Sequence, residues 1–321
     1  MNKRGKAIIL VIVGLLIGGL LLTWSFRNVA LADVIAVLTE QTKLLTFAIA
    51  LVLYLLFFVV KAYRWAELLV SPTKVPFSQL FSLVLLGYVG SIFVPMQMGE
   101  TIRSIVLKKR HKIPLASSLS GIGIEKLFDL ASIALLMLMA ALGSLLLTLD
   151  MQQALLMVGF ILVAAVCVLW ILLRFHRPIL HYLDDRHLDT DVTKWRVKLS
   201  QAMTEFFSLL TQLRARIVAI VIQSLLMWML MTASIYYVLI SLGLDVSWPV
   251  AVLVLFCSAL GLMLPTAPGF IGTIQAVFAL ALLPLGWQPE KVLAAAIAYN
   301  AMITLWPMLL AAIAGLFMVK R

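Results

Sequence analysis

Long apolar runs, separated by short polar connections, set the pattern of this chain. Six runs have the length of a membrane-spanning helix, at about 7–26, 44–63, 127–148, 153–173, 217–241 and 292–318. A helix crosses a bilayer with about 20 apolar residues, so each run predicts one span. The pattern therefore predicts an all-α, polytopic membrane protein with about six full transmembrane helices, forming a single transmembrane domain over residues 1–321.

Two further apolar regions are interrupted near the middle by proline and glycine. Region 77–107 breaks at "VPMQMGE" (Val94–Glu100), and region 249–283 breaks at "LPTAPGFIG" (Leu264–Gly272). Proline lacks a backbone N–H and glycine weakens a helix, so each region predicts two short helices around a break. The breaking residues are Pro95, Gly99, Pro265 and Pro268. Unpaired backbone is costly in lipid, so each break must be buried in protein or face water.

The positions of basic residues indicate how the segments are oriented. Lysine and arginine favour the cytoplasmic side, and they occur at 3–6, at 61–74 and most densely in "LKKRHK" (Leu107–Lys112). The first broken region lies between two of these basic segments. We therefore expect it to enter and leave the membrane by the same face, as a re-entrant element. We expect both termini in the cytoplasm and the protein in the inner or plasma membrane.

The second broken region has few positive residues at its ends, so we expect it to open from the outer face. Two broken segments in corresponding places indicate an inverted-repeat transporter, with approximate halves 1–150 and 151–321. The connection 174–216 is rich in charged residues and predicts a cytoplasmic loop with an amphipathic helix.

Composition and charge indicate which class of molecule the protein contacts. The chain is 64% apolar and 12% charged, with a net charge of +11. Its positive residues lie between apolar spans, where they favour anionic lipid headgroups rather than nucleic acid. Cys167 and Cys257 lie within apolar runs and are interpreted as packing residues, without metal-ligand spacing. We expect no metal and no cofactor; the sequence is compatible with an oligomer.

Charged residues at the first break are the strongest site candidates. Glu100 and Arg103 are three residues apart and would share one face of the helix that follows the break. Arg103 and the helix N-terminus can hold an anionic group such as phosphate, with Gln97 nearby in the break. The alternative is that both charges lie at the cytoplasmic interface and anchor the element.

Glu125 and Asp129 form a second candidate pair in "GIGIEKLFDL", four residues apart on one helical face. Acidic residues inside an apolar helix are expensive, so a partner is expected, either Arg103 or Arg64. This pairing can be structural, functional or both. Lys61 and Arg64 in "VVKAYRWAELL" are interpreted mainly as interfacial residues, and Arg64 inside the protein is the alternative.

The second half offers uncharged polar candidates. They are Gly269, Gly272, Thr273, Gln275 and Asn300. Such groups suit a substrate path, and they equally suit hydrogen bonds between helices.

The order of these motifs resembles the lysylphosphatidylglycerol synthase transmembrane (flippase-like) family. The resemblance runs through "YRWAELL", "FVPMQMGETIRSIVLKKRHKIPLASSLSGIGIEKLFDL" and "LPTAPGFIGTIQAVF" and covers nearly the whole chain. It implies inverted repeats with two re-entrant elements, and a role in moving lipids or lipid-linked sugars. The matching positions are Arg64, Pro95, Gly99, Glu100, Arg103, Glu125, Asp129, Pro268, Gly269 and Gly272. Gln97, Lys126 and Gln275 depart from the family pattern.

Three functional hypotheses follow. The first is a lipid flippase-like transporter for a phospholipid or a polyprenyl-phosphate-linked substrate, working by alternating access between the two re-entrant tips. The second is a non-catalytic accessory subunit that recruits or stabilises a lipid- or glycan-modifying enzyme. The third, a transferase using Glu125 and Asp129 as acid and base, is disfavoured because the sequence has no metal or nucleotide signature. No soluble synthase domain is expected within the chain, so we do not expect an enzyme.

Overall fold

The computed structural model is helical, with no strand among the residues it describes. Those residues are 16, 19–20, 23, 26–27, 29–69, 75–94, 99–143, 159–160, 164, 206, 208–209, 211–263 and 267–319. The elements in chain order are α2 (Leu31–Ala36), η1 (Val37–Gln41), α3 (Leu44–Leu68), α4 (Phe77–Phe93), α5 (Glu100–His111), α6 (Leu115–Gly143), η3 (Leu213–Arg216), α10 (Ile217–Ser241), α11 (Trp248–Gly261), η4 (Pro268–Phe270), α12 (Thr273–Leu282), η5 (Leu283–Leu285) and α13 (Pro289–Val319).

Four helical stretches in the described part of the chain are long and apolar enough to cross a membrane. They are Leu44–Leu68, Leu213–Ser241, Pro268–Leu285 and Pro289–Gly315. Three of them contain or overlap the predicted spans at 44–63, 217–241 and 292–318. The chain is thus a multi-pass membrane protein. The predicted spans 7–26 and 153–173 and the predicted loop 174–216 fall mostly outside the described residues.

Two helices extend beyond their predicted ends into charged sequence. Helix α3 continues to Leu68 instead of ending at 63, and α6 begins at Leu115 instead of 127. The predicted spans cover only the apolar part of each helix, because hydropathy falls where a helix carries charges, although the backbone stays helical when those charges are paired. Pro114 lies just before α6, where its missing N–H interrupts no helical hydrogen bond.

The chain divides into two compact units. Unit 1 comprises Met1–Ala62, Phe77–Arg103 and Leu226–Arg321, and unit 2 comprises Tyr63–Pro76 and Ser104–Leu225. The division into repeat halves 1–150 and 151–321 stays a prediction.

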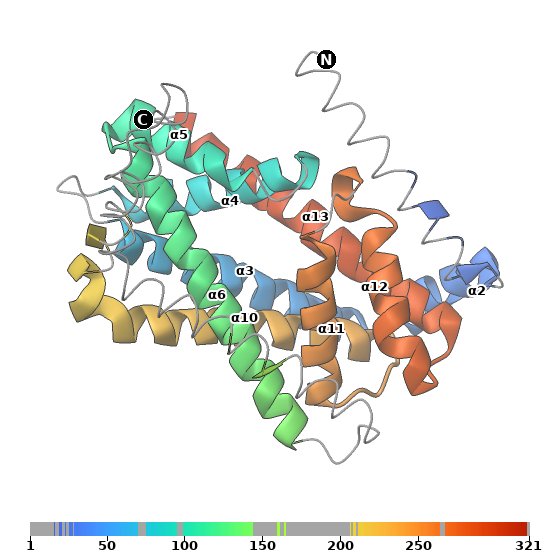
Figure 1. The fold of residues 1–321 in the computed structure, drawn as a ribbon. Coiled ribbons are helices and arrows are strands. Elements are labelled where there is room, and N and C mark those ends of the chain that lie inside the picture. Colours follow the sequence, from blue (N-terminus) through green and yellow to red (C-terminus); the bar gives the residue numbers. More distant parts are fainter. Residues whose placement is uncertain are drawn as a thin grey trace, which may run out of the picture. The chain divides into compact units, whose positions relative to one another are not determined.

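Unit 1 is built around α13. Helix α13 packs against α4 and against α12, and α12 in turn packs against α11 (Figure 1). Ser234 on α10 donates from its hydroxyl to the carbonyl of Ala50 on α3 at 2.9 Å, which ties two apolar helices together. Inside a bilayer such polar contacts supply specificity between surfaces that the hydrophobic effect alone does not distinguish.

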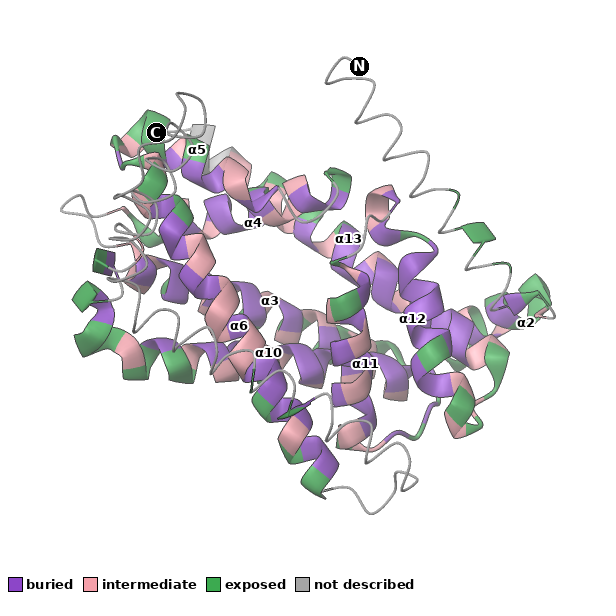
Figure 2. Cartoon of the chain, viewed as in Figure 1, coloured by how far each residue is buried: buried purple, intermediate pink, exposed green. Residues whose placement is uncertain are grey.

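The surface of α3 in unit 1 is apolar. Leu45, Ile49, Val52 and Leu56 follow a spacing of three or four residues and are all exposed, Leu45 to 79%. This spacing places them on one side of the helix. Figure 2 shows the exposed and buried positions alternating along such helices. An apolar stripe left exposed along a helix is what a lipid-facing surface requires.

The first broken region forms a tight pair of helices at its tip. Helix α4 ends at Phe93 and α5 begins at Glu100, as the Pro/Gly break predicts. Gly99 lies so close to the end of α4 that an added Cβ would stand 2.0 Å from the backbone nitrogen of Ser91. The two backbones therefore touch at this point, and Gly99 is required by close approach. Pro95 and Gln97 fall outside the described residues.

The second broken region also contains two helices around a break. Helices α11 and α12 flank a short turn, η4, in which Gly269 has φ of 74°, and Gly272 with φ of 82° precedes α12. These positive φ values suit glycine, which has no Cβ to clash. The turn η4 packs against α4 of the first broken region and against α13. Pro265 falls outside the described residues.

Nearly all of α12 is buried in protein, every residue except Leu280 (Figure 2). A half-length helix leaves backbone groups unpaired at its ends, and only a protein environment can satisfy them at membrane depth. The side chain of Gln275 does so here: its Oε1 accepts a hydrogen bond of 2.7 Å from the backbone N–H of Gly272.

Replacing Gln275 with alanine is expected to lower the free energy of unfolding by about 1–3 kcal/mol, because the buried N–H of Gly272 loses its acceptor. Thermal unfolding of the purified protein in detergent measures the change. Gln288→Ala is the matched control: Gln288 is exposed, and its loss should change stability by no more than about 0.5 kcal/mol. Equal effects of the two substitutions would contradict the capping role.

Candidate functional site

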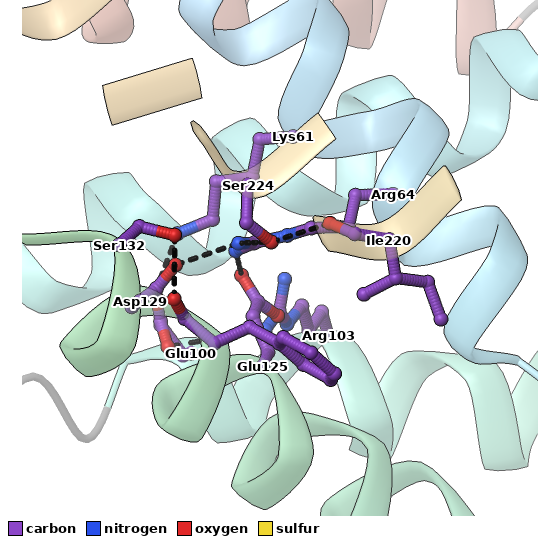
Figure 3. A network of polar contacts seen from close by, with 10 residues as sticks. Lys61, Arg64, Glu100, Arg103, Glu125, Asp129, Ser132, Ile220 and Ser224 are labelled. Atoms are coloured by element: carbon purple, nitrogen blue, oxygen red, sulfur yellow. Dashed lines mark hydrogen bonds and ion pairs between the residues drawn. The ribbon is translucent and has the colours of Figure 1, made fainter. Parts of the chain in front are cut away.

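Three charged side chains gather at the tip of the first broken region, within unit 1. We call Lys61, Glu100 and Arg103 the Lys61 cluster (Figure 3). Lys61 Nζ donates to Glu100 Oε1 at 3.0 Å, and Arg103 Nη2 lies 3.8 Å from Glu100 Oε2. All three side chains are buried, Arg103 to 1% exposure. Glu100 and Arg103 thus lie on one face of α5, at the spacing that the sequence gives them, and their binding roles stay predictions.

The local sequence explains this geometry. Gly99 allows α5 to start directly against α4, so the first turn of α5 lies inside the protein. Glu100 and Arg103 then share one face of that turn. A helix N-terminus carries partial positive charge, which stabilises the Glu100 carboxylate there and would equally stabilise a bound anion.

Lys61 corrects the sequence interpretation. It was expected to reach from the membrane interface into water, but its side chain is buried and paired with Glu100. The signal for this was present: Lys61 lies three residues before Arg64 on a helix that the structure extends to Leu68. Two cations on one helical turn inside an apolar run need anionic partners. The chain has carboxylates for them at Glu100 and at Glu125 and Asp129.

A second group of charges lies in unit 2. We call Arg64, Glu125, Asp129 and Ser224 the Arg64 cluster (Figure 3). Arg64 Nη2 donates to Glu125 Oε1 at 3.0 Å, and Nη1 donates to Asp129 Oδ1 at 2.7 Å. The four-residue spacing on α6 brings both carboxylates to the same guanidinium, so Arg64, one of the two partners that the sequence offers, contacts both of them.

Ser224 extends the Arg64 cluster to a third helix. Its hydroxyl accepts a hydrogen bond from Arg64 Nη1 at 2.9 Å and donates one to the backbone carbonyl of Ile220 at 2.7 Å. The arginine side chain is fully buried, and it joins α3, α6 and α10. This pattern is typical of a polar contact that holds helices together, because each named group bonds to a group on a different helix or to the backbone of its own helix.

The candidates of the second half occupy other positions in unit 1. Thr273 and Gln275 are buried in the first turn of α12, and Gln275 caps that turn. Gly269 and Gly272 provide its backbone conformation. Asn300 on α13 is buried, and its Nδ2 has no hydrogen-bond partner in the part of the chain that the structure describes. Binding roles for these residues stay predictions.

The family can now be stated from the whole sequence. The model of the lysylphosphatidylglycerol synthase transmembrane region matches residues 11–312, which include both broken regions and both charge clusters. The chain belongs to this family. The motif-based resemblance is therefore confirmed, and the transmembrane-region family identifies a lipid-related membrane protein.

One relative among curated proteins is glycosyltransferase AglD of Haloferax volcanii. It is 28% identical over 127 residues, which is 39% of this chain and 20% of that protein. The match thus spans about a fifth of the relative's length. This member of the transmembrane-region family shares a segment with a protein named for glycosyl transfer, and the segment is a minor part of it.

Proposed function

We propose that the protein is a flippase-like transporter that moves an anionic lipid, a phospholipid or a polyprenyl-phosphate-linked molecule, across the bilayer. The observation that carries the proposal is the Lys61 cluster: two cations and one carboxylate, buried together where an apolar segment breaks. Charged groups inside a membrane protein that line a break in a helix are typical of substrate pathways.

The chemistry of the Lys61 cluster suits a phosphate group. Arginine presents a planar fork of N–H donors that matches phosphate oxygens, and lysine adds a point charge. Glu100 contacts both cations and so holds them in place. When a phosphate enters, it can take over contacts that the carboxylate makes at 3.0 and 3.8 Å.

The two broken regions suit the conformational part of transport. Each has short helices around its break, and the turn η4 of one packs against α4 of the other within unit 1. Discontinuous helices can shift as short rigid pieces, so one tip can open while the other stays closed. Alternating exposure of the Lys61 cluster would then carry the headgroup across, while the acyl chains remain in lipid.

Arg103→Gln tests the proposal. In proteoliposomes with a fluorescent phosphatidylglycerol, we expect the rate of transbilayer movement to fall roughly 10- to 100-fold, the effect of losing one charge-assisted hydrogen bond of about 1.5–3 kcal/mol. Arg103→Lys should retain part of the rate. Arg110→Gln, an exposed arginine on the same helix, is the matched control and should move lipid at the wild-type rate. Wild-type movement by a folded Arg103→Gln protein would overturn the proposal.

The match to AglD favours a second candidate function. A related segment occurs in a much longer protein that is named a glycosyltransferase, so a transmembrane region of this family can accompany an enzyme. Under this alternative, the protein would be an accessory subunit that recruits or stabilises a lipid- or glycan-modifying enzyme. Stoichiometric co-purification with one such enzyme, together with no lipid movement by the protein alone, would favour it over transport.

A further inference from the structure

A short helical segment comes just before α3 and packs against the central helix of unit 1. It consists of α2 followed by the π-helix η1, and we call Leu31–Gln41 the α2–η1 segment. Val34 and Val37 are buried, and α13 packs against both α2 and η1. One side of the segment is therefore held by protein.

A second side of the α2–η1 segment is apolar and exposed. Leu31 and Ile35 are four residues apart, so they lie on one side of the helix, and they are exposed to 72% and 59% (Figure 2). Thr39 continues this side four residues further on, and its hydroxyl donates to the backbone carbonyl of Ile35 at 2.9 Å. Because that hydroxyl bonds to its own helix, the side needs no water to satisfy it.

A third side of the segment carries its acidic residues. Asp33 and Glu40 are seven residues apart, which places them on one side of the helix, and both are exposed. The segment thus has a buried side, an exposed apolar side and a charged side. An apolar side next to a charged one is typical of a helix that lies in the plane of the membrane interface.

The position of the segment in the chain agrees with an interface. Helix α3 has 25 residues and is about 37 Å long, enough to cross a hydrocarbon core of about 30 Å. Only Thr42 and Lys43 separate the segment from α3, and the backbone N–H of Lys43 donates to the carbonyl of Ser241 at the end of α10 at 2.8 Å. The segment therefore lies at the face of the bilayer where α3 begins. Leu44 and Leu45 are exposed there and start the apolar side of α3 that faces lipid.

We propose that the α2–η1 segment is a membrane-interface helix whose Leu31 and Ile35 contact lipid acyl chains, while Asp33 and Glu40 face the headgroups and water. Lipid is the occupant of the exposed apolar side because that side is continuous along the chain with the lipid-facing side of α3. The bilayer thereby holds the segment against α13, so that a lipid-bound element covers the central helix of unit 1. This assignment is independent of the proposed transport function.

Fluorescence quenching in vesicles tests the proposal on the full chain. Cysteine is introduced at Leu31 or Ile35 after Cys167→Ala and Cys257→Ala, labelled with a nitrobenzoxadiazole dye and reconstituted sparsely in phosphatidylcholine vesicles. A phosphatidylcholine with a spin label at carbon 5 of its acyl chain quenches from the lipid, and iodide on both sides quenches from water. We expect the lipid quencher to lower the emission at least about two-fold and iodide to have little effect, because interfacial helices bury their apolar side about 5–10 Å deep.

Glu40→Cys is the matched control on the charged side of the same segment, and its label should be quenched by iodide more strongly than by the lipid. Each labelled variant should unfold at the temperature of the unlabelled background, because the three positions are exposed. Quenching of the Leu31 and Ile35 labels by iodide as strongly as at Glu40 would overturn the proposal, since that side would then face water. Protection from both quenchers would also overturn it, since protein, either the apolar run 7–26 or a second copy of the chain, would then cover that side.

Discussion

Replacing Arg64 with methionine is expected to lower the free energy of unfolding by about 3–5 kcal/mol, the effect of removing one partner from a buried ion pair. The variant keeps the unbranched apolar stem of the side chain and removes the guanidinium with its charge and donors. Glu125 Oε1 and Asp129 Oδ1 then lose their ion-pair contacts of 3.0 and 2.7 Å with the guanidinium. Denaturant titration of the purified protein in detergent, followed by helical circular dichroism, measures the loss.

An exposed ion pair in the same unit provides the control. Arg216 Nη1 lies 3.4 Å from Glu67 Oε2, with side-chain exposures of 52% and 37%. The same substitution there, Arg216→Met, should lower stability by less than about 1 kcal/mol, because water screens exposed pairs. Similar losses at Arg64 and Arg216 would show that burial does not govern the Arg64 cluster.

A compensated variant separates lost pairing from lost packing. Arg64→Met combined with Glu125→Gln and Asp129→Asn removes all three charges and should recover most of the stability, since a buried ion pair replaced by neutral groups is often close to neutral. Arg64→Lys should fall between the single and the combined variants, because an ammonium cannot bridge two carboxylates as a planar guanidinium does. If the combined variant is as unstable as Arg64→Met, the cluster acts by shape and hydrogen bonding to Ser224 rather than by charge.

The helical breaks could be predicted from the sequence because their causes are local. Proline and glycine act on their own backbone, and the structure ends α4 at Phe93 and α11 at Gly261, next to the predicted interruptions. The start of α6 could have been predicted too, because proline is common at the start of a helix and Pro114 lies directly before α6, but a hydropathy argument does not consider it. At helix breaks and at helix starts, the positions of proline and glycine therefore predict the structure better than hydropathy does.

The pairing of charges could not be predicted in the same way. Lys61 and Arg64 are three residues apart on one helix, yet Lys61 pairs with Glu100 and Arg64 with Glu125 and Asp129. Which carboxylate each cation meets depends on how α3 is rotated and on which helices pack against it, and neither is encoded in local spacing. The sequence therefore named Arg64 as a candidate and overlooked Lys61, although both are buried.

Gly99→Ala is expected to disable the Lys61 cluster, although it adds a single methyl group. The new Cβ would lie 2.0 Å from Ser91 N and 2.2 Å from the carbonyl carbon of Gly90, both backbone atoms that cannot rotate away. The first turn of α5 must move off α4, with a strain of about 1–3 kcal/mol or more. Glu100 directly follows Gly99, so its 3.0 Å contact with Lys61 is lost with the same movement.

The glycines of this tip form a graded series that isolates the effect of backbone contact. A Cβ at Gly87 would meet Glu100 Cα at 3.4 Å, and one at Gly90 would meet the flexible end of Ile102 at 2.6 Å and Gly99 Cα at 3.2 Å. Alanine should therefore be best tolerated at Gly87, less at Gly90 and least at Gly99. Gly315→Ala, with nothing within 4 Å of the new Cβ, should leave the protein as stable as before or slightly more so.

The rate of lipid movement should fall in the order Gly87, Gly90, Gly99. The loss should reach roughly 100-fold at Gly99, because a displacement of about 1 Å in a binding group is enough for a loss of that size. A Gly99→Ala protein that unfolds like the wild type and moves lipid at its rate would show that α4 and α5 do not touch at this tip, and the buried position of Glu100 and Arg103 would then need another cause.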